Sequence, residues 1–193
     1  MCYNAYFISI CLATIGVCVF RCVGFGWRTF LFLEMDMFPY RVSFFGHRTL
    51  YSIRDLEKKL EDIVDTLIRN HQFVEFYVGR NGDFDISVAS VIKRVQHRVG
   101  EETCALILTL PYVVKDIEYY EKYYGEVIIP VEGKQHFKAA ITKRNEWMIE
   151  NSDLVITYVQ NESGGAYKAM KYAQSKGVKV LNIGNDRLTM ILK

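Results

Sequence analysis

The feature that most constrains the fold is a regular alternation, from residue 40 onward, of short apolar runs and longer segments of helical periodicity. The apolar runs predict strands at 40–45, 73–78, 104–109, 127–130, 154–158 and 178–183. Helices are predicted between them at 52–68, around 88–95, and at 115–124, 136–151 and 165–175. Apolar strands separated by helices require a parallel sheet that is covered on both faces. The sequence therefore predicts an α/β fold with a mostly parallel sheet between two layers of helices.

Three glycine-containing loops, at 45–48, 79–85 and 162–166, follow predicted strands. Glycine lets the backbone approach a ligand closely, and the N-terminus of a helix offers free N–H groups and a partial positive charge. Because the carboxyl ends of parallel strands meet at one edge of a sheet, these loops predict a phosphate or nucleotide site. The alternative is that they are ordinary turns. The predicted ligand-binding glycines are Gly46, Gly79, Gly82, Gly164 and Gly165.

One arginine lies on the apolar face of the predicted helix 136–151. Arg144 follows Ile141 by three residues and precedes Met148 by four, so the three side chains share a face. A guanidinium turned towards a core needs a partner, either a protein carboxylate or a bound phosphate. The alternative is that Arg144 extends along the surface to reach solvent. The adjacent Asn145 is predicted to orient a ribose or a base.

Several polar residues in the loops have two interpretations each. Asp85 either caps the following helix or accepts hydrogen bonds from ligand hydroxyl groups. His47 binds a ligand, acts as an acid or base, or caps its strand, and Arg48 is either a second phosphate-binding cation or solvated. Glu162, Asp85 and His47 are the candidate catalytic residues. No zinc signature or Ser-His-Asp order is present, and we expect neither a metal nor a cofactor.

Residues 1–38 differ from the rest of the chain because they are almost entirely apolar. They are interpreted as a membrane anchor, with Arg21 and Arg28 on the cytoplasmic side, or as a secretory signal or a packed helix. A further interpretation is that translation starts at Met35 or Met37. The predicted organisation is therefore an N-terminal extension, 1–38, and a folded domain, 39–193. The folded domain contains a single cysteine, Cys104, so it has no pair of cysteines to form a disulfide within it. This suits a reducing compartment, and we expect the domain to be cytoplasmic.

The charge of the chain bears on its partners. A net charge of +2 without a basic run gives no electrostatic argument for nucleic acid. A membrane is an expected partner only if residues 1–38 belong to the natural protein. The tyrosine-rich stretch 119–124 predicts a lid or an interface, and a homo-oligomer is one form that such an interface takes.

Taken together, the motifs resemble the SLOG superfamily of Rossmann-like nucleotide-binding proteins, and most closely its small bacterial and phage group related to YpsA. The matching pieces are Phe45-Gly46-His47-Arg48; Gly79 with Gly82, Phe84, Asp85 and Ala89; 144–148; Asp153; and Gly164-Gly165 with Tyr172-Ala173. The resemblance implies a Rossmann-like three-layer sandwich. It also implies a nucleotide-derived ligand at the carboxyl edge of the sheet, held by Arg144, Asn145 and the glycine loops.

The resemblance leaves three functions open. Sensing or regulation through a bound nucleotide is the first expectation. A phosphoribohydrolase like the Lonely Guy enzymes, which remove the base from nucleoside monophosphates, is the second. A single-stranded DNA-binding protein like DprA is the third. The Lonely Guy motif Gly-Gly-x-Gly-Thr-x-x-Glu is incomplete here, because Ala169 stands where its catalytic glutamate is expected.

Overall fold

The computed structural model describes residues 9–12, 17–20, 38–50, 53–133 and 136–184. The chain divides into two units, Met1–Phe38 and Pro39–Lys193. In the first unit, β1 (Ser9–Leu12) pairs antiparallel with β2 (Val17–Phe20). Among the described residues, no helix is both long enough and apolar enough to cross a membrane. The packed-helix interpretation does not hold at the described residues 9–12 and 17–20, which are strands. The interpretations as an anchor, a signal or a later translation start stay predictions.

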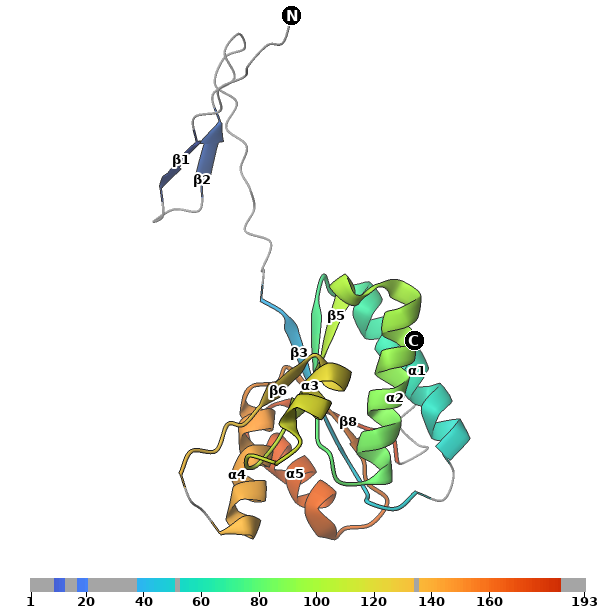
Figure 1. Cartoon of the computed structure of the whole chain (residues 1–193). Coiled ribbons are helices and arrows are strands. Elements are labelled where there is room, and N and C mark those ends of the chain that lie inside the picture. Colours follow the sequence, from blue (N-terminus) through green and yellow to red (C-terminus); the bar gives the residue numbers. More distant parts are fainter. Residues whose placement is uncertain (1–8, 13–16, 21–37, 51–52, 134–135, 185–193) are drawn as a thin grey trace, which may run out of the picture. The chain divides into compact units, whose positions relative to one another are not determined.

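The second unit is built on a six-stranded sheet in which every pair of neighbours is parallel (Figure 1). Its strands are β3 (Tyr40–Gly46), β4 (Val74–Val78), β5 (Cys104–Thr109), β6 (Glu126–Ile128), β7 (Leu154–Tyr158) and β8 (Lys179–Asn182). The order is β6-β5-β4-β3-β7-β8. From β3 the chain adds β4, β5 and β6 on one side of that strand. It then adds β7 and β8 on the other side of β3. Ligands of open α/β sheets bind at such a switch point, here between β3 and β7.

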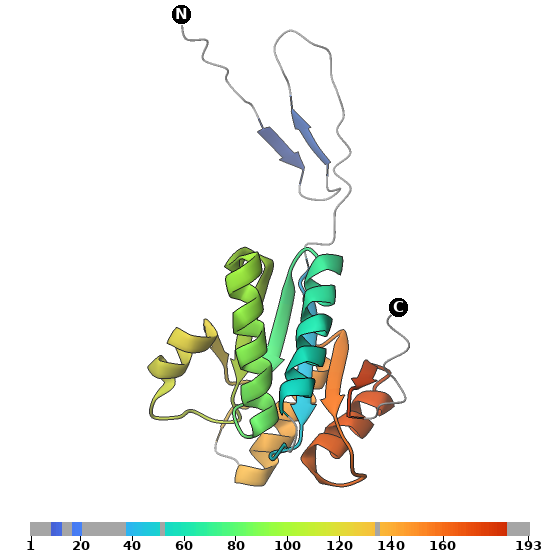
Figure 2. The ribbon, with the colours of Figure 1, turned by 90° about the vertical axis from the view of Figure 1, so that its right-hand side faces the viewer.

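Helices cover both faces of this sheet. The helices are α1 (Ile53–Asn70), α2 (Asp83–Val99), α3 (Ile117–Tyr124), α4 (Phe137–Glu150) and α5 (Gly164–Ser175), with a 3-10 turn η1 (Glu101–Thr103). Figure 2 shows α1 and α2 side by side in front of the sheet. Their apolar faces join Val42 and Phe44 of β3 in one core, whereas Phe45 belongs to a second core with α4 and α5. The alternation of side chains along β3 therefore supplies both cores.

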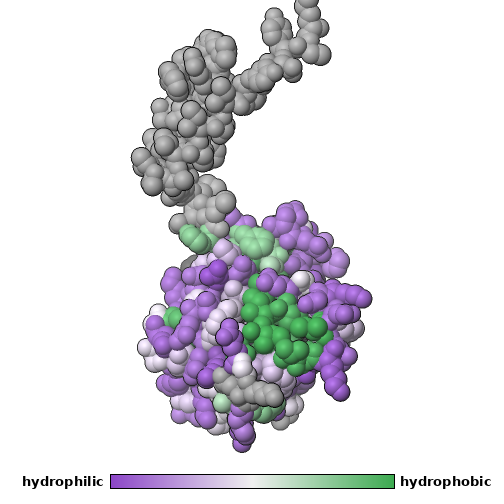
Figure 3. Space-filling view, turned by 60° about the vertical axis from the view of Figure 1, so that its left-hand side comes forward, coloured by the Kyte–Doolittle hydropathy of each residue, from purple (hydrophilic) through white to green (hydrophobic). Residues whose placement is uncertain are grey.

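The predicted architecture is confirmed, because the domain is a Rossmann-like α/β sandwich with an all-parallel sheet. Each predicted strand is present, with ends that move by at most two residues. The surface is mostly hydrophilic on the face drawn in Figure 3, where a hydrophobic area lies among polar side chains. Helix α4 is tied to β3, since the Ser43 hydroxyl donates to the Met148 carbonyl over 3.1 Å. This bond holds the C-terminal part of α4 against β3.

Candidate functional site

A cavity of about 400 Å³ opens at the carboxyl edge of the sheet, and we call it the edge cavity. It is bounded by the loop after β3, the start of α2, one face of α4 and the N-terminus of α5. The predicted ligand-binding residues that line it are Gly46, His47, Arg48, Asp85, Arg144, Asn145, Gly164 and Gly165. The fold therefore brings together residues that lie more than 100 positions apart in the chain.

Arg144 is the most unusual residue of the edge cavity. It is 8% exposed, and its Nε atom is buried without a hydrogen-bond partner. Its Nη1 atom lies 3.4 Å from the thioether sulfur of Met148, which is a weak acceptor. Burial lowers the pKa of Arg144, and the charge of Asp85 opposes that shift. The interpretation in which Arg144 reaches solvent is wrong, because the side chain is buried and its guanidinium lies against Met148 and the backbone at Gly79.

Gly79 makes room for both Arg144 and Asp85. A Cβ atom at Gly79 would lie 2.6 Å from Asp85 Oδ2 and 2.8 Å from Arg144 Nη1. The two charged side chains therefore press on the same point of the backbone, although they form no direct ion pair among the described residues. Gly79 does not line the edge cavity. Its contribution there is to let the charged pair approach the end of β4.

Asp85 does not cap α2, contrary to that interpretation. The helix begins two residues earlier, at Asp83, and Gly82 is its N-cap. Instead, Asp85 faces the edge cavity and accepts a hydrogen bond from the backbone N–H of Asn81. Burial raises the pKa of Asp85 to about 6, while Arg144, the Asn81 N–H and Arg48 act in the opposite direction. A carboxyl group with this pKa changes its charge close to neutral pH.

The loops after β3 and β4 are locked together by Asp83 and Gly82. The Asp83 carboxylate accepts from the Leu50 N–H over 3.1 Å, and the Asp83 N–H donates to the Arg48 carbonyl over 2.8 Å. Gly82 has φ +148°, and a Cβ atom there would lie 3.0 Å from Arg48 Cα. Gly82 is therefore required for close loop packing, and like Gly79 it does not line the edge cavity.

Two residues at the end of β3 bring further elements to the edge cavity. A side chain at Gly46 would overlap the ring of Phe84, so glycine lets α2 begin directly against the strand. His47 Nε2 accepts a hydrogen bond from the Gln160 N–H over 3.1 Å. His47 thereby joins the loop after β3 to the loop after β7, across the switch point of the sheet.

The N-terminus of α5 closes the opposite side of the edge cavity. Its N-cap, Ser163, forms no side-chain capping bond, and Gly164 has φ +89°. Gly164 and Gly165 have open space where a side chain would be. The first N–H groups of a helix have no partner within the helix. They therefore supply hydrogen-bond donors and partial positive charge to a ligand in the edge cavity.

The remaining catalytic candidate, Glu162, is exposed on the loop before α5 and does not line the edge cavity. Ala169 is buried in the core under α5. Asp85 is consequently the one carboxylate among the described lining residues. No cluster of three metal-ligating side chains occurs in the described part of the chain.

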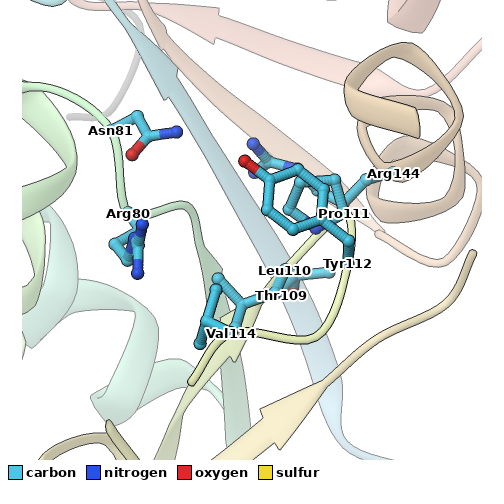
Figure 4. A pocket seen from close by; sticks show the side chains of 8 residues that line it. All are labelled: Arg80, Asn81, Thr109, Leu110, Pro111, Tyr112, Val114 and Arg144. Carbon is cyan, nitrogen blue, oxygen red and sulfur yellow. The ribbon is translucent and has the colours of Figure 1, made fainter. Parts of the chain in front are cut away.

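Five lining residues lie outside the predicted set, namely Phe44, Phe45, Asn81, Ile141 and Ala166. Asn81 was detectable as a member of the 79–85 loop, and Ile141 as the residue one turn before Arg144. A second, smaller hollow of about 10 Å³ adjoins the first, because Arg144 and Asn81 line both (Figure 4). Its wall includes Tyr112 and Thr109. The hydroxyl oxygen of Thr109 is buried and has no hydrogen-bond partner.

Neither a protein-family model nor a curated protein matches this sequence. Solved structures do match. The domain shares its fold with DNA processing protein A (DprA). The X-ray structure of DprA from Streptococcus pneumoniae superposes with a TM-score of 0.56 at 16% identity, over 74% of this chain and 49% of that protein. DprA from Helicobacter pylori, described for its single-stranded DNA binding mode, gives 0.54 at 16% identity, over 74% of this chain and 64% of that protein.

The chain thus spans less than two thirds of the length of either DprA protein. At 16% identity the likeness establishes the Rossmann-like fold, and it carries neither ligand nor activity to this chain. A specific relationship to the YpsA group stays a prediction.

Proposed function

We propose that the edge cavity binds a nucleotide or a nucleotide-derived ligand through its phosphate, and that the protein senses or regulates rather than turns over that ligand. The observation that carries the proposal is Arg144, a buried guanidinium whose Nε has no partner. Asp85 is a nearby opposite charge but forms no ion pair with this guanidinium among the described residues. A buried charge whose hydrogen bonds are incomplete costs several kcal/mol, on the order of what a bound anion returns. A phosphate accepts parallel hydrogen bonds from a guanidinium, which fits this need.

The surroundings of Arg144 support an anion. Arg48 lines the same cavity and adds a second cation. The N-terminus of α5 faces the cavity with Gly164 and Gly165, which leave room for a ligand beside the backbone. The positive charge of Arg144, Arg48 and the N-terminus of α5 is larger than the single negative charge of Asp85. A phosphate bound between Arg144 and α5 would therefore be favoured electrostatically.

Asp85 and Asn145 are assigned to the sugar or the base. A carboxylate repels a phosphate but accepts hydrogen bonds from the hydroxyl groups of a ribose. Asn145 carries both a donor and an acceptor, so it is able to pair with either part of a nucleoside. In this arrangement the phosphate is held at Arg144 and α5, and Asp85 contacts hydroxyl groups.

The second candidate is hydrolysis of a nucleoside monophosphate to ribose 5-phosphate and free base. The observation that favours this reaction is Asp85, which is the carboxylate among the described lining residues and has a pKa raised to about 6. As a base it would take a proton from water attacking C1′, while the bond from C1′ to the base nitrogen breaks and the base leaves with that electron pair. Glu162 has no part in this reaction, since its side chain is exposed and does not line the cavity.

The DprA-like alternative, binding of single-stranded DNA, rests on the shared fold alone. A net charge of +2 gives it little electrostatic support. Steeply salt-dependent binding of an oligonucleotide would favour it over the mononucleotide.

Thermal unfolding of the full chain with nucleoside monophosphates, cyclic nucleotides, NAD and ADP-ribose tests the proposal. A ligand present at about one hundred times its Kd adds nearly 3 kcal/mol of stability, which is a clear shift in Tm. The shift should vanish in Arg144→Met and persist in Lys143→Met, the exposed neighbour on the same helix. A well-folded protein that responds to none of these ligands would refute the proposal. Free base released from AMP would favour the hydrolase.

A further inference from the structure

Two exposed aromatic side chains contact each other near the carboxyl edge of the sheet, and we call them the aromatic pair. Tyr112, in the loop after β5, is 37% exposed, and Phe137, the first residue of α4, is 53% exposed. Their ring centroids are 5.7 Å apart at an interplanar angle of 42°. Both side chains come from segments at the carboxyl edge of the sheet, where the edge cavity also opens.

The aromatic pair lies in line with Arg144. Phe137, Ile141 and Arg144 follow each other at intervals of four and three residues, so they form one stripe on α4. Ile141 and Arg144 of this stripe line the edge cavity. The rise of an α-helix places Phe137 about 10 Å further along the axis than Arg144. Phe137 itself does not line the edge cavity, but it precedes by one turn Ile141, which does.

Tyr112 reaches the same region from the β5 side. It lines the small hollow together with Arg144, and Figure 4 shows its ring beside that arginine. The hollow has room for no more than about one water molecule, so a base does not fit inside it. The exposed parts of the aromatic pair are instead available to a base that lies outside the hollow. An aromatic ring lying there would remain within a nucleotide's length of the Arg144 guanidinium.

We infer that the aromatic pair stacks with the base of the nucleotide whose phosphate Arg144 holds. This inference rests on the proposed function, and it specifies the ligand class. The site would bind nucleoside phosphates in preference to sugar phosphates that lack a base. Stacking uses the π-face that all bases share, so the site would discriminate only weakly between one base and another.

The test compares the affinity of AMP with that of ribose 5-phosphate, each measured by calorimetric titration of the full chain. AMP is expected to bind at least about tenfold more tightly, which is the effect typical of one stacked base. Phe137→Ala should remove most of this difference by weakening AMP and leaving ribose 5-phosphate unchanged. Phe137→Trp should retain it. Tyr119→Ala is the matched control, because Tyr119 is an exposed aromatic residue of α3 whose ring contacts Tyr120 and not the aromatic pair.

Each outcome separates this inference from the proposed function. Equal binding of AMP and ribose 5-phosphate, still dependent on Arg144, would overturn the stacking inference and leave phosphate binding intact. Binding of neither compound nor any other nucleotide would overturn both. A change in oligomeric state in Phe137→Ala, with AMP affinity unchanged, would assign the aromatic pair to a contact between protein molecules and likewise overturn the inference. Loss of both ligands in Phe137→Ala but not in Phe137→Trp would mean that the ring supports the cavity instead of the base.

Discussion

The raised pKa of Asp85 has a measurable consequence for the stability of the free protein. Burial shifts this pKa from 3.8 to about 6, so between these values the native state binds a proton more tightly than the unfolded state. The contribution of Asp85 to stability is therefore greatest below pH 4 and is lost as pH rises through 6. This is the opposite of the usual carboxylate, whose native pKa is depressed.

The magnitude follows from the size of the shift. One pKa unit corresponds to about 1.4 kcal/mol, so a shift of roughly two units is worth about 3 kcal/mol in total. Between pH 4.5 and pH 7.5, the free energy of unfolding that Asp85 contributes falls by about 2 kcal/mol according to the linkage relation. Wild type should lose about that much stability relative to Asp85→Asn over the same interval, because the amide does not titrate.

Urea unfolding of both proteins at a series of pH values measures this difference directly. Subtracting the two curves cancels the titration of groups that the proteins share. Arg144→Met should move the transition to higher pH, because the guanidinium charge lowers the pKa of Asp85 in the wild type. The quantity to compare is the free energy of unfolding of wild type minus that of Asp85→Asn. If it stays constant within about 0.5 kcal/mol, or increases with pH, the buried environment assigned to Asp85 is refuted.

Two further predictions concern how the site is held. Gly46→Ala should destabilise the domain by about 3 kcal/mol, because its new methyl group would overlap the buried ring of Phe84. Gly165→Ala has open space and should change the free energy of unfolding by no more than about 1 kcal/mol; equal effects would contradict the packing. Asn182 donates to the Val159 carbonyl and accepts from its N–H, each over 3.0 Å. Asn182→Ala should therefore cost about 2 kcal/mol in urea unfolding, and a loss below about 0.5 kcal/mol would show that water replaces these bonds.

The sequence predicts the strands well because central parallel strands are apolar on both faces. Phe76 of β4 and Leu106 of β5 are buried in one core, and their neighbours Tyr77 and Ile107 are buried in the other. Such segments have no competing local interpretation. The two edge strands are less apolar. Strand β6 begins one position earlier than predicted and includes the exposed Glu126, and β8 begins one position later, at the exposed Lys179.

The site is less predictable, because its chemistry depends on contacts between distant segments. Helical spacing puts Arg144 on the apolar face of α4, but its burial depends on Gly79, 65 positions earlier, which leaves space for the guanidinium. The start of α2 was misplaced for a similar reason. Asp83, rather than Asp85, begins the helix, where it bonds to the loop after β3 at Leu50. The contact between Tyr112 and Phe137 likewise spans the whole of α3 and β6.

The most direct test of the central claim is the Kd of a nucleoside monophosphate for the wild-type protein and for Arg144→Met, with Lys143→Met as control. Truncating one partner of a buried charge pair costs roughly 2 kcal/mol or more. The Kd should therefore rise about thirtyfold or more in Arg144→Met and stay unchanged in Lys143→Met. A wild-type protein that binds the nucleotide with the same affinity as Arg144→Met would contradict the assignment of Arg144 as the phosphate-binding residue.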